Sequence, residues 1–182
     1  MLCRKGVTTI ADAISTALPD FSLRFAEPND CGLILGLIRE LAEYEKLAHE
    51  VVASEETLRE TLFGERPAAE VVIGEHRGAA VAYAIFFHNF STFTGRPGIY
   101  LEDIYVKPAM RGRGYGKCLL TYVAKLAVAR KCARMEWSVL DWNAPSIEFY
   151  QSLGAVAMDE WTAQRLAGKT LDSVAAMFQE SP

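Results

Sequence analysis

A short turn rich in arginine and glycine contains the residues whose types and spacing most clearly suit a chemical task. The turn comprises Arg111, Gly112, Arg113, Gly114, Tyr115, Gly116 and Lys117. Alternate glycines let a backbone approach a ligand closely, and the free N–H groups at the start of a helix attract an anion. Because a helix is predicted to follow directly, the turn predicts a site for a pyrophosphate group.

Other interpretations of the same turn fit the sequence less well. A Walker A loop needs a hydroxyl side chain where Cys118 stands, and its glycine spacing differs. A dinucleotide-binding fingerprint needs Gly-x-Gly-x-x-Gly early in a βαβ unit, whereas this turn reads Gly-x-Gly-x-Gly after several predicted strands. RNA binding is disfavoured because the protein is acidic and has one short cluster of this kind. A solvated turn stays open on this motif alone.

The hydrophobic pattern predicts one α/β domain that holds the turn between a strand and a helix. Apolar runs predict strands at 22–26, 71–73, 79–87, 98–106, 135–140, 155–158 and 162–167. Apolar stripes at helical spacing predict helices at 29–46, 54–63, 115–131, 144–152 and 170–178. The three strands within 71–106 predict an antiparallel meander. With 182 residues, we expect an N-terminal extension over 1–21 and a single domain over 22–182.

Charge is segregated along the chain more strongly than the net value of −4 suggests. The segment 27–70 holds eleven acids and four bases, whereas 107–134 holds eight bases and no acid. The basic segment surrounds the glycine turn and fits a ligand that carries several phosphate charges. The overall acidity argues against nucleic acid or an anionic membrane as the main partner.

The four cysteines form no CxxC pair and have no histidine at ligand spacing, so no metal site is expected. Cys31 and Cys118 lie in apolar helical patterns typical of buried thiols in a reducing compartment, which indicates the cytoplasm. No apolar run approaches the ~20 residues of a membrane helix, and no secretory signal is evident. Neither a membrane nor a nucleic acid is therefore an expected partner.

With its neighbours, the turn resembles the acetyl-coenzyme A loop of the GNAT N-acetyltransferase superfamily, whose pattern is Arg/Gln-x-x-Gly-x-Gly/Ala. Arg111, Gly114 and Gly116 match this pattern. Four further segments resemble the diamine (spermidine/spermine) and thialysine acetyltransferase branch, and they lie at 40–46, 63–67, 100–106 and 140–150. The resemblance spans about residues 22–167. It implies the acyl-CoA N-acyltransferase fold, a central mixed and mostly antiparallel sheet flanked by helices, and a homodimer.

The resemblance also implies which residues contact acetyl-CoA and which do the chemistry. The coenzyme contacts would be Ile104, Tyr105, Val106, Arg111, Gly112, Arg113, Gly114, Tyr115, Gly116, Lys117, Asn143, Ser146 and Tyr150. Glu102 matches the glutamate that relays a proton from the amine, and Tyr150 matches the tyrosine that protonates the thiolate. A phenol with a pKa near 10 stays protonated at neutral pH and is a sensible donor to a thiolate. For Asn143, plain helix capping stays open as well.

Amine binding would fall to Glu43, Glu45, Ser91, Glu102 and Asp103. Ordinary pleating would point Asp103 away from the face that Glu102 occupies, and a bulge would change this. Polyamine-selective members carry an acidic residue where Ser91 stands, so Ser91 favours the thialysine type. A solvated acidic helix face is the alternative for the glutamates.

These residues together predict an enzyme that transfers the acetyl group of acetyl-CoA directly to a primary amine of a small cationic substrate in a ternary complex. No cysteine adjoins Glu102 or Tyr150, which argues against an acyl-enzyme intermediate. Two alternatives stay open: a coenzyme A-binding regulatory domain without turnover, and acetylation of a protein or peptide amine. The sequence leaves the identity of the amine and the choice of acyl chain undecided.

Overall fold

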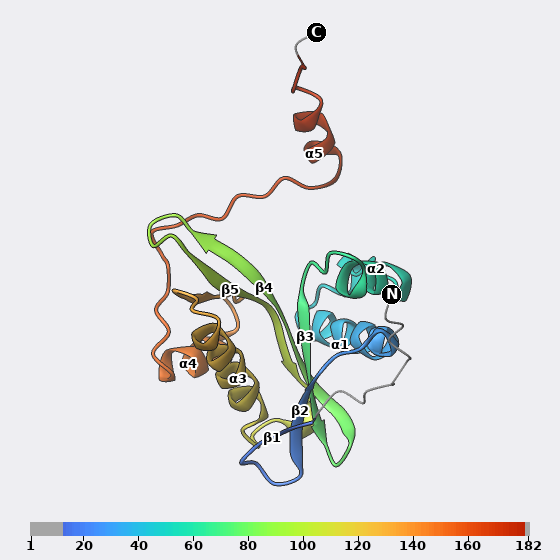
Figure 1. The fold of residues 1–182 in the computed structure, drawn as a ribbon, viewed down its shortest axis with the longest axis vertical. Coiled ribbons are helices and arrows are strands. Elements are labelled where there is room, and N and C mark those ends of the chain that lie inside the picture. The colour runs from blue at the N-terminus through green and yellow to red at the C-terminus, as the bar shows by residue number, and fades with distance from the viewer. Residues whose placement is uncertain (1–12, 181–182) are drawn as a thin grey trace, which may run out of the picture. The chain divides into compact units, whose positions relative to one another are not determined.

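The computed structural model describes residues 13–180 of the chain. It has two compact units, with the boundary between Ser138 and Val139, and each is described by itself. The first unit holds a six-stranded sheet with helices on both faces (Figure 1). The second holds helices α4 (Ala144–Ser152) and α5 (Gly168–Ala175).

The sheet of the first unit runs in the order of the sequence, from β1 to β6. The strands are β1 (Ile14–Ser15), β2 (Phe21–Phe25), β3 (Glu70–His76), β4 (Ala79–Ser91), β5 (Arg96–Val106) and β6 (Met135–Glu136). All neighbours pair antiparallel except β5 and β6, which are parallel. The predicted antiparallel meander and the mixed, mostly antiparallel sheet are confirmed.

Helices cover both faces of this sheet because its central strands are apolar on both sides. Helices α1 (Cys31–Tyr44) and α2 (Glu55–Phe63) pack on the face that carries Val71, Ile73 and Ile85. Helix α3 (Tyr115–Ala129) lies on the other side of the sheet, as Figure 1 shows. Short 3-10 helices at Pro28–Asp30, Ala48–Glu50 and Pro108–Met110 connect the elements.

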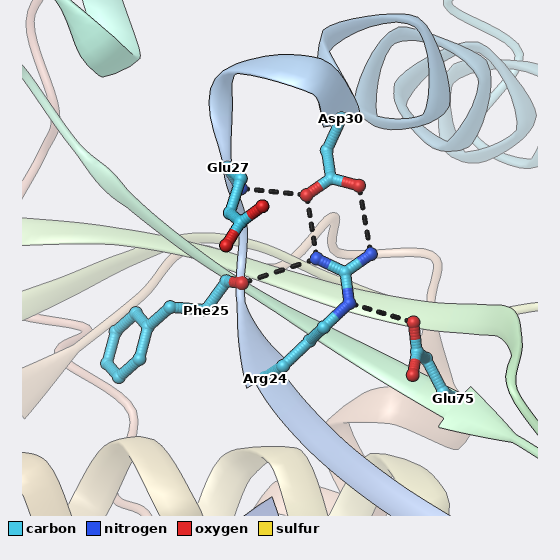
Figure 2. Close-up of polar contacts among 5 residues, drawn as sticks. All are labelled: Arg24, Phe25, Glu27, Asp30 and Glu75. Atoms are coloured by element: carbon cyan, nitrogen blue, oxygen red, sulfur yellow. Dashed lines mark hydrogen bonds and ion pairs between the residues drawn. The ribbon is translucent and has the colours of Figure 1, made fainter. Parts of the chain in front are cut away.

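An ion cluster fixes the entry of the chain into α1 (Figure 2). Arg24 on β2 donates two hydrogen bonds to the Asp30 carboxylate, at 2.7 and 2.9 Å, and a third to Glu75 on β3 at 2.8 Å. The same carboxylate accepts the backbone N–H of Glu27 at 2.7 Å. The cluster therefore joins two strands to the start of α1, the helix whose far end carries Glu43 and Glu45.

The structure differs from the sequence prediction in three places. Strand β1, which pairs with β2, lies inside the predicted N-terminal extension, whose residues 1–12 fall outside the described part of the chain. The strand predicted at 135–140 is reduced to Met135–Glu136. The strands predicted at 155–158 and 162–167 are wrong: no ladder partner is recorded for them among residues 13–180, and a strand persists only when its backbone groups are paired. The domain boundaries themselves stay a prediction.

Candidate functional site

The glycine turn lies between β5 and α3, as the sequence predicts. Gly112 and Gly114 have φ angles of 74° and 84°, in the left-handed region that disfavours residues with a Cβ. No hydrogen-bond acceptor is recorded in residues 13–180 for the backbone N–H groups of 112–117, because the first capping bond runs from Cys118 to Gly114. A row of unpaired donors at the start of a 15-residue helix fits the oxygens of a pyrophosphate.

The hairpin of β1 and β2 contacts this turn from one side. Leu18 lies 3.5 Å from the point that a Cβ at Gly114 would occupy. Tyr115 stacks on Phe21 with ring centroids 3.9 Å apart, and its hydroxyl is hydrogen-bonded to His76 Nδ1 at 2.8 Å. A pocket of about 350 Å³ opens beside Tyr115. The turn is thus held against the first strands of the sheet as well as by α3.

The two arginines of the turn take different positions. Arg111 turns back on the protein: its Nε donates to the carbonyl of Val106 at 3.0 Å, and its guanidinium lies 4.4 Å from the ring centroid of Tyr44. Tyr105 lies under the same guanidinium at 5.7 Å. Arg113 lines the pocket beside the turn, and no ion pair is recorded for it within the described residues. Arg111 therefore links the turn to the end of α1.

Three of the eight basic residues in the segment 107–134 are neutralised by carboxylates. Lys107 pairs with Glu40 at 3.0 Å, Arg130 binds Glu70 through both guanidinium N–H groups, and Arg134 pairs with Glu136 at 2.8 Å. Within residues 13–180 no ion pair is recorded for the three basic residues of the turn, Arg111, Arg113 and Lys117. Of the five bases of this segment without a recorded ion pair in the described residues, three thus belong to the turn, and the other two are Lys125 and Lys131.

A bulge in β5 decides which way the acidic residues before the turn point. Asp103 is opposite Ile85 and Leu101 is opposite Phe86, so Glu102 has no register partner on β4. Because of this extra residue, Leu101 lies on the Phe86 face whereas Asp103 lies on the opposite face with Ile85 and Tyr105, which α1 covers. Ordinary pleating is therefore interrupted here, and Asp103 lies on the α1 side.

Asp103 is the centre of a group of partly buried carboxylates. Its Oδ2 accepts the hydroxyl of Tyr83 at 3.0 Å. Burial raises the pKa of Asp103, the Tyr83 hydrogen bond lowers it, and the charge of Glu102 raises it again, so the net shift is upward. Burial also raises the pKa of Glu45 at the end of α1, and the charge of Asp103 adds to this. Such a group favours binding of a cation, because a positive charge would relieve the repulsion.

Other predicted amine contacts lie at varying distances from this group. Glu43 is exposed near the end of α1 and its charge is among the causes that raise the pKa of Tyr105, after burial and the nearby Glu40. Ser91 is buried at the far end of β4, opposite Arg96. It stands six positions along the strand from Ile85, about 20 Å away. The structure therefore brings Glu45, Glu102 and Asp103 together but not Ser91.

Along its other edge, β5 is mostly unpaired. Its parallel pairing with β6 is limited to Ile99 with Met135 and Tyr100 with Glu136. Beyond Tyr100, the β6 side of residues 101–106 has no ladder partner in the described part of the chain. Backbone groups around Ile104 and the N–H of Val106 are thus available to a ligand that lies along the strand and reaches the turn, whereas the Val106 carbonyl accepts Arg111 Nε.

The remaining predicted residues belong to α4 in the second unit. Asn143 caps this helix, with its side chain accepting the N–H of Ser146 at 3.4 Å, so the capping interpretation is confirmed. Tyr150 lies in the last turn of the same helix. In the described residues, no group of three or more His, Cys, Asp or Glu side chains is placed to hold a metal ion. The same part of the chain has no helix long and apolar enough to cross a membrane.

Comparison with known proteins identifies the family and the fold of the chain. Residues 38–155 match the family model described as the acetyltransferase (GNAT) family. The chain belongs to this acetyltransferase family. Thialysine N-epsilon-acetyltransferase of Sus scrofa is 43% identical over 84% of this chain and 96% of that protein. L-ornithine N5-acetyltransferase of Arabidopsis thaliana is 31% identical over 91% of this chain and 93% of that protein.

Solved structures agree on the GNAT fold at lower sequence identity. An integron cassette protein from V. cholerae has a TM-score of 0.73 and 24% identity, covering 86% of this chain and 98% of that one. An aminoglycoside acetyltransferase from a soil metagenome has a TM-score of 0.70 and 16% identity, covering 82% and 97%. The recognition of this GNAT branch from the sequence is confirmed. The protein is an N-acetyltransferase that transfers an acetyl group from acetyl-CoA to an amine of a small substrate.

Two residues that shape the site of this GNAT enzyme were not predicted from the sequence pattern. Tyr83 lies in the nearly continuous apolar run of β4. It carries the only polar side-chain group between Ala79 and Phe87, and this pattern could have indicated a buried hydrogen bond. Glu40 binds both the Tyr105 hydroxyl at 3.2 Å and Lys107 at 3.0 Å. Its position on α1 gave no signal, because the partners are more than sixty residues away.

Proposed function

We propose that the strand β5 carries both halves of the catalytic site of this N-acetyltransferase. The observation that carries the proposal is the position of Asp103 in this strand, three residues before Val106, whose carbonyl anchors Arg111 of the glycine turn. The carboxylates suit a cationic amine and the turn suits a pyrophosphate. Two substrates of opposite charge would thus be bound by adjoining stretches of one strand.

The coenzyme would lie along the unpaired edge of β5 and end at the turn. Backbone groups of Ile104, Tyr105 and Val106 would bind its pantetheine arm, and the unpaired N–H groups of 112–117 would bind its pyrophosphate. Arg113 and Lys117 would add positive charge. Asn143 and Ser146 of α4 are assigned coenzyme contacts from the family pattern. The thioester of this co-substrate supplies the acetyl group.

Proton transfer would be divided between two residues. An alkylammonium has a pKa near 10.4 and must lose a proton before it can attack the thioester. Glu102, the bulged residue, would accept this proton through water. Tyr150 would donate a proton to the departing thiolate. Glu43, Glu45 and Asp103 would bind the substrate through its positive charge, and Ser91 keeps its assignment as an amine contact from the family pattern.

The amine is proposed to be a short amino acid side chain of the thialysine or ornithine type. The relatives at 43% and 31% identity are a thialysine and an ornithine acetyltransferase, and both align over most of their length. Ser91 supports the same choice, because it stands where polyamine-selective members carry an acidic residue. Acetylation of a protein or peptide amine is the alternative that the experiment must separate.

A panel of amines with acetyl-CoA, monitored by thiol release, tests this function directly. The panel would hold thialysine, ornithine, lysine, diamines, spermidine and a lysine-containing peptide. We expect the highest kcat/KM for thialysine or ornithine. Thiol release from none of these amines would favour a coenzyme-binding domain without turnover, and a preference for the peptide would contradict the small-substrate assignment.

The role of Tyr150 has its own test. Tyr150→Phe should lower kcat at least tenfold while leaving the affinity for acetyl-CoA within about twofold, because the phenol acts on the thiolate after binding. Tyr100→Phe, which removes a phenol hydroxyl bonded to Ser138 in β5, is the matched control and should leave kcat near the wild-type value. An unchanged kcat in Tyr150→Phe would refute the assigned role.

We also infer a cytoplasmic homodimer with one catalytic domain over 22–182. The described cysteines, Cys31, Cys118 and Cys132, are all free thiols, which supports a reducing compartment. Dimerisation rests on the family pattern. Light scattering after gel filtration would measure the mass, and 20.1 kDa would contradict the dimer. A variant that starts at residue 22 would test the domain boundary through its activity.

A further inference from the structure

Tyr83 places a hydroxyl group in the most apolar part of the sheet. Its side chain is fully buried on β4, at 0% exposure, in the core cluster between α1 and the sheet. The neighbouring residues Ala82, Ala84 and Phe86 are equally buried. Burying a phenol hydroxyl costs free energy unless it is hydrogen-bonded, and phenylalanine would fill the same space without that cost.

The hydroxyl of Tyr83 has one partner recorded in residues 13–180, the Oδ2 atom of Asp103 at 3.0 Å. A carboxylate can only accept, so the phenol must be the donor. Burial and the charge of Asp103 raise the pKa of Tyr83 well above its ordinary value, which keeps the proton on the phenol. The bond therefore favours the ionised form of Asp103 and fixes the carboxylate in one orientation.

The other charged neighbours of Asp103 are carboxylates, which disfavour its ionised form, whereas the Tyr83 hydrogen bond stabilises that form. The charges of Glu102 and Glu45 lie close enough to interact with it, and no ion pair is recorded for Asp103 among the described residues. Its Oδ1 has no hydrogen-bond partner recorded there either, while Oδ2 is occupied by Tyr83. Oδ2 of Asp103 thus accepts the Tyr83 hydroxyl in the core, and Oδ1 can bind a ligand.

We propose that Tyr83 is a positioning residue for the amine substrate: its hydroxyl holds Asp103 ionised and oriented so that the free carboxylate oxygen binds the ammonium group of the substrate. This inference rests on the proposed function, because it needs an amine that binds at Asp103. Tyr83 itself touches neither substrate. It acts through Asp103 and leaves the coenzyme loop unaffected.

Tyr83→Phe tests this proposal with little change of volume. A hydrogen bond to a charged group is worth enough to change binding about tenfold. We therefore expect KM for the best amine of the panel to rise about tenfold, with KM for acetyl-CoA and kcat at saturating amine within twofold. Tyr100→Phe is the matched control, because it removes a phenol from β5 whose partner is Ser138, and it should leave both KM values unchanged.

The pH profile supplies a readout that a merely structural role would not move. Removing the Tyr83 hydrogen bond takes away a contribution that lowers the pKa of Asp103, so that pKa rises. The acidic limb of kcat/KM for the amine should therefore shift to higher pH in Tyr83→Phe. In Asp103→Asn the contribution of Asp103 to this limb should be lost, and adding Tyr83→Phe to Asp103→Asn should cause no further shift of the limb and no further loss of kcat/KM.

The outcomes separate the inference from the proposed function. A wild-type protein that acetylates no amine contradicts the proposed function, whatever Tyr83 does. With an active wild type, an amine KM and a pH limb in Tyr83→Phe that match Tyr100→Phe overturn the inference. Equal rises in KM for both substrates overturn it too, since they indicate a general structural defect. If Tyr83→Phe fails to fold, the acidic limb in Asp103→Asn still decides whether Asp103 contributes to it, and a limb identical to that of the wild type overturns the inference.

Discussion

Replacing Asp30 by asparagine should destabilise the first unit, because it removes the charge that binds Arg24 at the junction of β2 and α1 (Figure 2). Asparagine keeps the shape of the side chain and an oxygen that can still accept the N–H of Glu27. Of the two hydrogen bonds from Arg24, the one at 2.7 Å to the retained oxygen loses its charge assistance, and the one at 2.9 Å is lost because an amide NH2 group cannot accept. The substitution thus removes the charge and one acceptor while it keeps the packing.

The size of the effect follows from how exposed the pair is. The Arg24 and Asp30 side chains are 18% and 14% exposed. Breaking a fully buried pair costs about 3–5 kcal/mol. Arg24 keeps its bond to Glu75 at 2.8 Å, so its charge is not left uncompensated. A hydrogen bond to a charged group is worth about 1.5–3 kcal/mol, and we expect a loss of about 2–3 kcal/mol.

Urea unfolding at pH 7, monitored by far-UV circular dichroism, measures this loss. With an m-value of about 2 kcal/mol/M, the midpoint should fall by about 1–1.5 M. Asp20→Asn is the matched control, because Asp20 pairs with Arg77 at 2.9 Å with the side chains 49% and 74% exposed. An exposed pair is worth about 0.2–1 kcal/mol. A loss in Asp30→Asn no larger than in Asp20→Asn would refute the reasoning.

The same pair gives a pH dependence of defined sign. Burial raises the pKa of Asp30, but the hydrogen bonds from Arg24 and Glu27 and the charge of Arg24 outweigh it, so the pKa is lowered on folding. The stabilisation is therefore fully present above the unfolded value of about 3.9 and disappears as pH falls through the folded value. The difference between wild type and Asp30→Asn should be constant from pH 6 to 7 and shrink below pH 4. A difference that persists at low pH would contradict the assignment to charge.

Four further substitutions have simpler expectations. Ser54→Ala should cost about 1 kcal/mol in urea unfolding, because the Ser54 hydroxyl accepts the Thr57 N–H at 3.1 Å as the cap of α2. Ile34→Ala, at a fully buried position of α1, should cost about 2–5 kcal/mol in the same assay. Gly114→Ala should weaken acetyl-CoA binding measured by calorimetry, because φ is 84° there, whereas Gly78→Ala, at φ 77° in the β3–β4 turn, should lower stability and leave coenzyme binding unchanged.

Local signals explain why most elements could be predicted from the sequence. The predicted α2 begins after Ser54 and ends at Phe63, and the structure gives the same bounds because the cap and the following Gly64 act within one turn. Helix α4 was predicted equally well from Asn143. The strands predicted after Gly154 were wrong because apolar alternation says nothing about whether a pairing strand exists.

The turn of the site could be predicted, but the roles of its arginines could not be separated. Arg111 and Arg113 are two positions apart and look equivalent as anion ligands in the sequence. In the structure Arg111 lies over Tyr44, which stands 67 positions earlier at the end of α1. Only the packing of α1 against β5 brings that ring to the turn. A pairing this distant in the sequence leaves no periodic signal.

The side of the sheet on which Asp103 lies was the least predictable feature of the site, and it has the largest consequence. Leu101 is opposite Phe86, so unbroken pleating from Leu101 would place Asp103 on the Phe86 face, away from Tyr83 and the end of α1, and the acidic segment of α1 would meet no second carboxylate. One extra residue at Glu102 reverses this, so that Asp103 meets Tyr83 and Glu45 while Glu102 stays exposed beside them. A single register shift in β5 therefore converts an acidic helix end into a cation-binding group next to the acetyl-CoA turn.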